Sequence, residues 1–271
     1  MNSFYLLAGL GMIVLLLIIW VSILRKQNQL LEKLIGHANE KLERLQTHFG
    51  RFTPEEVIEH LAAADGKYLA KMRNVTVLFA DLKGFTKMCE SMDPQQVVSI
   101  LNGYFRAMSE ALASHHGQVT ELMGDGILAL FGALSSNPWQ AQDAVLGAIA
   151  MRKSLEKYNE ELKSRSLPQL SFGIGIHQGE VLAGVMGNAE LSKFGVVGDT
   201  INVAARVEAM TRLHNCDLLI TEEVREGLDE RFSIDKMPPL AVKGKGKPIV
   251  TYYVHDFDPI IDRGKERHSV S

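Results

Sequence analysis

The octet FADLKGFT, Phe79 to Thr86, follows the apolar run Val75 to Leu78 and places one carboxylate, Asp81, where that run ends. The run is rich in β-branched and apolar residues, so it predicts a buried strand. Carboxylates at strand ends often bind metal ions, and a loop with a glycine lets phosphate approach the backbone. Alone, Asp81 is equally consistent with a turn residue that ends the strand.

The chain from about 67 to 257 alternates predicted strands and helices. A helix is expected to begin at Asp93-Pro94, because an aspartate cap followed by proline starts helices. Further elements are expected at Val119–Met123 and Ile127–Phe131 (strands joined at Gly124-Asp125-Gly126), Pro138–Lys163 (helix), Leu170–His177 and Glu180–Ala183 (a hairpin turning at Gln178-Gly179), Thr200–Leu213 (helix), and Asp217–Ile220 and Ile249–His255 (strands). The order β-α-β-β-α-β predicts an α+β, ferredoxin-like fold with helices on one face of an antiparallel sheet.

The stretch Phe4–Leu24 contains no charged residue. As a helix it would span roughly 30 Å, the thickness of a bilayer's hydrocarbon core. The positive residues Arg25 and Lys26 follow it, so the positive-inside rule predicts a single transmembrane helix at residues 4–24 with the rest of the chain in the cytoplasm. A buried soluble helix is the alternative, but the run is apolar on all its faces.

Residues 25–66 are predicted to form a helical linker. Its apolar positions fall close to a heptad stripe and are Leu31, Leu34, Ala38, Leu42 and Leu45. The stripe favours a short parallel coiled coil between two chains over a solvated spacer helix. Residues 258–271 are expected to be a disordered tail.

The composition excludes several classes of protein. The 271 residues are 46% hydrophobic and 23% charged, with a net charge of −3. The chain therefore lacks the excess of basic residues that is typical of nucleic-acid-binding proteins. The two cysteines, Cys89 and Cys216, are too few for a disulfide framework or a thiolate zinc site.

In the predicted topology the first strand and the hairpin are neighbours, which brings Asp81 and Asp125 together. Two close carboxylates repel each other unless a cation lies between them. A hard cation such as Mg²⁺ takes oxygen ligands and shares them with phosphates, and the backbone N–H groups of residues 82–86 would suit a triphosphate. The octet is therefore predicted to be half of a metal and triphosphate site.

Five stretches together resemble the catalytic domain of the class III nucleotidyl (adenylate and guanylate) cyclases, in a single-span membrane-anchored form. They are VTVLFADLKGFT (75–86), LMGDGILALFG (122–132), FGIGIHQGEVLAGVMG (172–187), VVGDTINVAARVE (196–208) and VKGKGKPIVTYYV (242–254). Their order along residues 67–257 makes the resemblance specific. It implies a homodimer with active sites at its interface, which converts a purine nucleoside triphosphate to its cyclic monophosphate and pyrophosphate. The predicted span would place this catalytic domain on the cytoplasmic side of the inner or plasma membrane.

The resemblance also implies roles for individual residues. Asp81 and Asp125 match the metal aspartates, which would hold two Mg²⁺ or Mn²⁺ ions per site, and Leu82, Gly84, Phe85 and Thr86 match the phosphate loop. Asn202 matches the ribose-orienting asparagine and Arg206 the arginine that stabilises transition-state charge. Lys243 matches the lysine on the terminal phosphates, with Lys245 as a second candidate. The aspartates would act with the asparagine, arginine and lysine of the partner chain.

Two positions are implied to read the base, and here they are Glu121 and Gly195. Adenylate cyclases commonly have Lys and Asp or Thr there, and guanylate cyclases Glu and Cys. A carboxylate accepts hydrogen bonds from guanine N1–H and its amino group but meets a lone pair on adenine. Glu121 therefore favours GTP over ATP, unless it faces outward without touching the base. Gly195 fits neither pattern, although its N–H could donate to guanine O6.

Three alternatives remain open at this point. The first is an adenylate cyclase or an enzyme of mixed specificity. The second is a catalytically silent nucleotide-binding signalling dimer, which the intact set Asp81, Asp125, Asn202 and Arg206 disfavours. The third is a metal-dependent polymerase of similar palm topology, which the helix carrying Asn202 and Arg206 disfavours.

Overall fold

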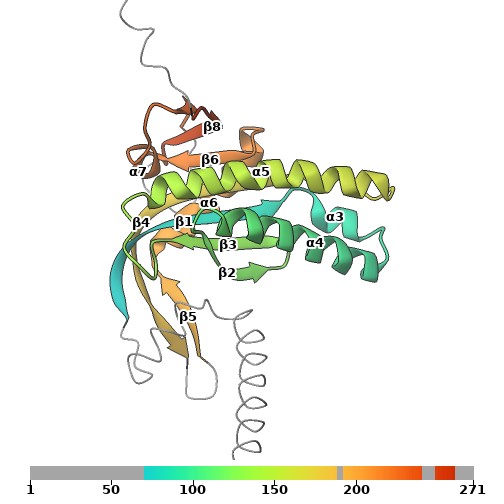
Figure 1. Ribbon diagram of the computed structural model, residues 1–271, viewed down its shortest axis with the longest axis horizontal. Coiled ribbons are helices and arrows are strands. Elements are labelled where there is room, and N and C mark those ends of the chain that lie inside the picture. The colour runs from blue at the N-terminus through green and yellow to red at the C-terminus, as the bar shows by residue number, and fades with distance from the viewer. Residues whose placement is uncertain (1–69, 188–191, 240–247, 260–271) are drawn as a thin grey trace, which may run out of the picture. The chain divides into compact units, whose positions relative to one another are not determined.

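Strand β1, Lys71–Leu82, runs through the middle of the sheet and carries the predicted metal carboxylate near its end. The computed structural model describes residues 70–187, 192–239 and 248–259 (Figure 1). The predicted membrane span, the coiled-coil linker, Lys243 and Lys245 lie outside these ranges. Within the described ranges, no helix is both long enough and apolar enough to span a bilayer.

The described strands form an eight-stranded sheet in the order β2-β3-β1-β4-β6-β8-β7, with β5 paired to β4. Their bounds are β2 Gln118–Met123, β3 Gly126–Phe131, β4 Phe172–Gly187, β5 Ser192–Val197, β6 Leu218–Thr221, β7 Phe232–Lys236 and β8 Thr251–Phe257. The run β2-β3-β1-β4 is the order of a ferredoxin-like motif, so the α+β prediction is confirmed. The sheet is mixed rather than antiparallel, because β4 and β6 are parallel and are joined by a helical crossover.

Helices α4 (Pro94–Ala113) and α5 (Gln140–Ser164) cover one face of the sheet (Figure 1). The start of α4 is as predicted, because the Asp93 carboxylate accepts hydrogen bonds from the backbone N–H groups of Gln95 (3.1 Å) and Gln96 (3.3 Å). The main core lies between these helices and the sheet, and its largest fully buried side chains include Tyr104, Phe131 and Leu78. This face of the sheet is therefore filled by packing.

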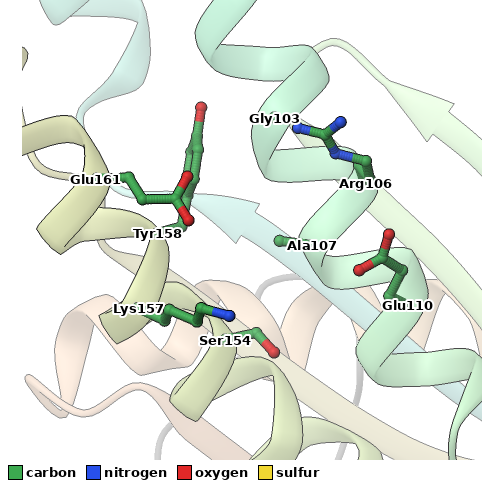
Figure 2. Close-up of a pocket in the computed structure, with 8 residues that line it drawn as sticks. All are labelled: Gly103, Arg106, Ala107, Glu110, Ser154, Lys157, Tyr158 and Glu161. Atoms are coloured by element: carbon green, nitrogen blue, oxygen red, sulfur yellow. The ribbon is translucent and has the colours of Figure 1, made fainter. Parts of the chain in front are cut away.

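A polar groove of about 170 Å³ lies between α4 and α5 (Figure 2). It carries both signs of charge, from Arg106 and Glu110 on α4 and from Lys157 and Glu161 on α5. Because side chains alternate along β1, Asp81 points to the opposite face of the sheet from the one that these helices cover. The groove is therefore not part of the predicted metal site.

Helix α6, Asp199–Leu213, packs against the other face of the sheet, over β4 and β1. The prediction that the helices share one face is wrong for α6. Its contact is close because glycines line β4 beneath it. An added Cβ on Gly173 would clash with Thr211, and one on Gly175 would clash with the backbone of Glu208. Bare backbone at alternate positions of β4 thus lets α6 lie directly on the sheet.

The predicted hairpin at Gln178-Gly179 is wrong. Strand β4 is continuous from Phe172 to Gly187 and pairs with β1 from Phe172 to Ala183, with Gly179 opposite Val75. The glycine is needed for a close approach rather than for a turn, since an added Cβ would lie 2.9 Å from Thr200 Oγ1. The strand that returns beside β4 is β5, which forms an arm with the end of β4 (Figure 1).

The sequence patterns did not predict four short elements, and they place the tail boundary slightly early. The missed elements are α3 (Phe85–Cys89), β5, α7 (Glu222–Arg225) and β7. Elements of four to six residues contain too few periodic positions to stand out from loops. Asp258, the first residue of the expected disordered tail, donates its backbone N–H to the Arg231 carbonyl (2.9 Å). The domain therefore includes this residue.

Candidate metal and phosphate site

The fold brings Asp81 and Asp125 to the same end of the sheet, where β1 ends and β2 turns into β3. Asp81 is the penultimate residue of β1, and Asp125 lies in the turn between β2 and β3. An added Cβ on Gly126, the residue after Asp125, would lie 3.5 Å from Asp81 Oδ1. One oxygen of Asp81 therefore faces the turn that carries Asp125, as the predicted topology required.

Electrostatics shows that the two carboxylates interact. Burial, and after it the nearby negative charge of Asp81, raises the pKa of Asp125 above its usual value. A hydrogen bond from its own backbone and the positive charge of Arg212 oppose that rise. Ionising both carboxylates is unfavourable unless a cation is nearby, so the pair suits a hard divalent ion.

These two carboxylates provide only part of a coordination shell. No cluster of three or more His, Cys, Asp or Glu side chains in the described part of the chain is placed to hold a metal ion. Mg²⁺ commonly binds through one or two carboxylates and completes its shell with water and substrate phosphate oxygens. Asp81 and Asp125 fit that kind of site, and their metal binding stays a prediction.

A cation already contacts this site and was not predicted. Arg212 Nη2 on α6 donates to Asp81 Oδ2 at 2.6 Å, and Arg212 Nη1 donates to Glu208 Oε1 at 3.0 Å and Oε2 at 3.2 Å. The i,i+4 spacing of Glu208 and Arg212 signals an ion pair along the helix. The contact of Arg212 with Asp81 depends on how α6 crosses the sheet, which no local sequence pattern contains.

Glu208 is almost completely buried, with 4% of its surface exposed. Burial is the main cause that raises the pKa of Glu208 from 4.5 to about 7, and the charge of Asp81 adds to it. Arg212, through its charge and its hydrogen bonds, and Lys83 act in the opposite direction. Glu208 therefore changes its protonation state near neutral pH, next to the predicted metal site.

The predicted phosphate loop is smaller than the sequence suggested. Leu82 is buried in β1, where it pairs with Phe172, and the Lys83 N–H donates to the Ser171 carbonyl at 2.7 Å. The Lys83 ammonium donates to the Cys216 carbonyl at 2.6 Å. The backbone N–H of Lys83 is therefore not available to a phosphate, and the role of Leu82 stays a prediction.

The remaining loop residues form the start of α3. Gly84 caps this helix with φ of 71°, a left-handed conformation that glycine adopts without strain. The first hydrogen bond of the turn comes from Met88 N–H to the Gly84 carbonyl (3.2 Å), so the N–H groups of Gly84, Phe85 and Thr86 precede it. The Phe85 side chain is 7% exposed and anchors the loop in the core. Three consecutive N–H groups are thus held in place three to five residues after Asp81.

Asn202 and Arg206 both lie on α6 and share one side of it, being four residues apart. Asn202 is exposed and Arg206 is half-buried. Arg206 Nη1 is buried and has no hydrogen-bond partner among the described residues. A helix rises about 1.5 Å per residue, so Asn202 lies roughly 15 Å along the axis from Arg212, which contacts Asp81. The contact with Asp81 is therefore made at the other end of α6 from Asn202.

The two predicted base-reading residues belong to different parts of the sheet. Glu121 on β2 is opposite Leu128, so it points to the same face as Asp81. Gly195 on β5 is opposite Gly184, and an added Cβ there would lie 2.8 Å from Met186 Cε. The Met186 side chain therefore occupies the space that a side chain at position 195 would enter.

Residues 68–256 match the sequence model of a family described as the adenylate and guanylate cyclase catalytic domain. An adenylate cyclase of Anabaena cylindrica is 36% identical over 227 residues, which cover 79% of this chain and 44% of the relative. Adenylate cyclase 1 of Rhizobium meliloti is 28% identical over 208 residues, covering 76% of this chain and 31% of the relative. The chain thus spans less than half the length of these two curated relatives.

Solved structures with the same fold include cyclases of both kinds. A crystal structure of the guanylyl cyclase Cya2 is 33% identical with a TM-score of 0.64, covering 70% of this chain and 95% of that one. The adenylyl cyclase CyaB from P. aeruginosa is 24% identical with a TM-score of 0.66, covering 72% of this chain and all of that one, and it shows the fold alone. All of these similar proteins are named as cyclases, but some are named adenylate cyclases and one a guanylyl cyclase, so the names do not agree on the purine nucleotide.

Proposed function

The chain belongs to the adenylate and guanylate cyclase catalytic-domain family, and we propose that it converts a purine nucleoside triphosphate to its 3′,5′-cyclic monophosphate and pyrophosphate. The observation that supports this most is the approach of Asp81 to the turn that carries Asp125. Burial and the negative charge of Asp81 raise the pKa of Asp125, and two acidic side chains this close fit a site for divalent cations better than a structural pair.

Asp81 and Asp125 would hold two Mg²⁺ or Mn²⁺ ions. Bound there, the ions would activate the ribose 3′-hydroxyl and neutralise negative charge on the phosphates. The N–H groups of Gly84, Phe85 and Thr86 would bind phosphate oxygens next to them, because consecutive backbone donors form an anion site. This part of the active site belongs to one chain.

The partner chain would supply the other part. Arg206, whose buried Nη1 lacks a partner among the described residues, would donate to the phosphate as negative charge develops there. Asn202 would orient the ribose, and Lys243 and Lys245 would reach the terminal phosphates. Asn202 and Arg206 are fixed relative to each other because α6 is packed on the sheet through Val203, Ala204 and Val207.

In a symmetric homodimer, the metal-binding half of each chain would face the Asn202 and Arg206 half of the other, which gives two active sites. An exposed apolar row supports an interface at the β4–β5 arm. It consists of Met72, Leu182 and Val197, which are 61%, 41% and 56% exposed and lie side by side across three strands. Adjacent exposed apolar side chains of this kind favour contact with another protein surface.

We propose GTP as the preferred substrate, because Glu121 points to the Asp81 face and a carboxylate matches the donors of guanine. The opposing candidate is ATP, which the relatives named adenylate cyclase favour. Gly195 offers no side chain to either base, so selectivity for guanine would rest on Glu121.

We also propose that residues 4–24 anchor the chain in the inner or plasma membrane as a single span, with the cyclase domain in the cytoplasm. The support is the uncharged stretch followed by Arg25 and Lys26.

The test is to incubate the purified 271-residue chain with Mn²⁺ and either GTP or ATP, and to separate the products by chromatography. Cyclic GMP as the main product supports the full proposal. Cyclic AMP as the main product, or both in comparable amounts, refutes the GTP preference and leaves the cyclase. No cyclic nucleotide from either substrate, from protein that is folded and binds Mn²⁺, refutes the cyclase.

A further inference from the structure

Arg212 supplies a positive charge at the place where the proposed function puts divalent ions. Its Nη2 is 2.6 Å from Asp81 Oδ2, while Asp81 Oδ1 faces the turn that carries Asp125. The two oxygens of this carboxylate therefore have different surroundings: one is bonded to a guanidinium and one faces the turn that carries Asp125. A divalent ion that used both oxygens would require Arg212 to leave Oδ2.

Arg212 has a second acceptor within reach. Its other terminal nitrogen, Nη1, already contacts both oxygens of Glu208 at 3.0 and 3.2 Å. Glu208 is four residues before Arg212 on α6, and its side chain is 5% exposed while that of Arg212 is 41% exposed. The guanidinium is therefore held by a buried carboxylate on its own helix and contacts Asp81 through its more accessible end.

Resting on the proposed function, we infer that Arg212 is a built-in competitor for divalent ions at Asp81, and that Glu208 is the acceptor to which its guanidinium withdraws. In the metal-free protein Arg212 partly neutralises the acidic pair. When an ion binds at Oδ2, Arg212 keeps its hydrogen bonds to Glu208, so the displaced charge is not left without a partner.

This assignment predicts opposite signs for two neighbouring substitutions. Arg212→Gln removes the competing charge, and Coulomb's law at distances of a few ångströms predicts Mn²⁺ binding that is tighter by about tenfold. Glu208→Gln removes the negative charge that draws Arg212 away, so Arg212 binds Asp81 more firmly and Mn²⁺ binds more weakly. A purely structural role for the pair would weaken metal binding in both variants.

The experiment is a titration of the 271-residue chain with Mn²⁺ in the absence of nucleotide, with free Mn²⁺ measured by electron paramagnetic resonance. Arg212→Met, which keeps the length of the side chain without its charge, is the second variant in case Arg212→Gln does not fold. Tighter Mn²⁺ binding in Arg212→Gln, or in Arg212→Met where the first variant does not fold, supports the inference. Unchanged or weaker Mn²⁺ binding in that variant overturns it. Stronger or unchanged binding in Glu208→Gln also overturns it.

Two further comparisons test whether the effect passes through the named contacts. In an Asp81→Asn background, Arg212→Gln should raise the residual Mn²⁺ affinity much less than in the wild type, because the oxygen that Arg212 contacts is no longer anionic and only the effect of its charge on Asp125 is removed. In an Arg212→Gln background, Glu208→Gln should have much less effect than in the wild type. Independent, additive effects in these double variants would contradict the competition.

The readout separates this inference from the proposed function, since it needs neither substrate nor turnover. A chain that forms no cyclic nucleotide but shows the opposite signs refutes the cyclase and retains the competition. A chain that forms cyclic nucleotide but binds Mn²⁺ no better without Arg212 refutes the competition and retains the cyclase.

Discussion

Gly175 of β4 lies so close beneath Glu208 of α6 that an added Cβ would come within 2.7 Å of the Glu208 Cα. This contact fixes the height of α6 above the sheet. It thereby positions Arg212 against Asp81 and sets the direction in which Asn202 and Arg206 project. The geometry of the proposed site thus depends on a residue that has no side chain.

Substituting Gly175→Ala should therefore lower stability by about 1–3 kcal/mol, because backbone atoms of α6 cannot move aside as a flexible side chain would. Gly147→Ala on α5 is the matched control. A Cβ there would meet its nearest neighbours, Leu112 Cδ2 and Phe131 Cζ, at an ordinary 3.5 Å, and alanine is favoured over glycine within a helix. Chemical denaturation should show opposite signs for the two variants. Equal effects would contradict the close contact.

Glu208 should make stability depend on pH. Its pKa is raised from 4.5 to about 7 in the folded protein, chiefly by burial, so the folded state binds a proton that the unfolded state releases. The resulting stabilisation is fully present below about pH 4.5 and is lost as the pH rises through about 7, at up to about 1.4 kcal/mol per pH unit. Thermal unfolding between about pH 5 and about pH 8 should show a flatter dependence for Glu208→Gln than for the wild type. Parallel curves would count against the raised pKa.

Changing Glu121→Lys together with Gly195→Asp should move activity from GTP towards ATP. Lysine donates where Glu121 accepts, and the new aspartate accepts from the adenine amino group, so each base meets the opposite pattern of hydrogen bonds. Met186 must shift to admit a side chain at position 195 in the double variant, so Gly195→Ala serves as the control for that movement alone. The ratio of kcat/KM for the two nucleotides is the measurement. If the ratio stays unchanged, these positions do not read the base.

Mixing two inactive variants should restore activity if sites are shared between chains. Asp81→Ala removes the metal half of the site and Arg206→Ala removes the half supplied by the partner. A heterodimer of the two would keep one intact site of its two, so random mixing should recover about a quarter of wild-type turnover. Each variant alone should stay inactive. Absence of recovery, with heterodimers present, would contradict the shared site.

The strands and helices with clear periodicity could be predicted from the sequence. The approach of Asp81 to Asp125 also followed, because a hairpin beside β1 fixes which residues meet. The sequence around Gly179 could not predict that β4 is continuous, since a glycine is equally typical of a turn and of a close packing contact. The contact of Arg212 with Asp81 could not be predicted either, because it requires α6 to cross the opposite face of the sheet at a particular height.

The central claim is that Asp81 and Asp125 together bind the divalent ions that are needed to cyclise the nucleoside triphosphate. The direct measurement is Mn²⁺-dependent turnover of Asp81→Asn, Asp125→Asn and the double variant, with Glu110→Gln in the α4–α5 groove as the control. Each single change should lower kcat by about a hundredfold or more, and the double variant should lose little beyond the worse single variant, because the two residues act as one unit. Independent losses that multiply, or turnover that survives either single change, would contradict the account.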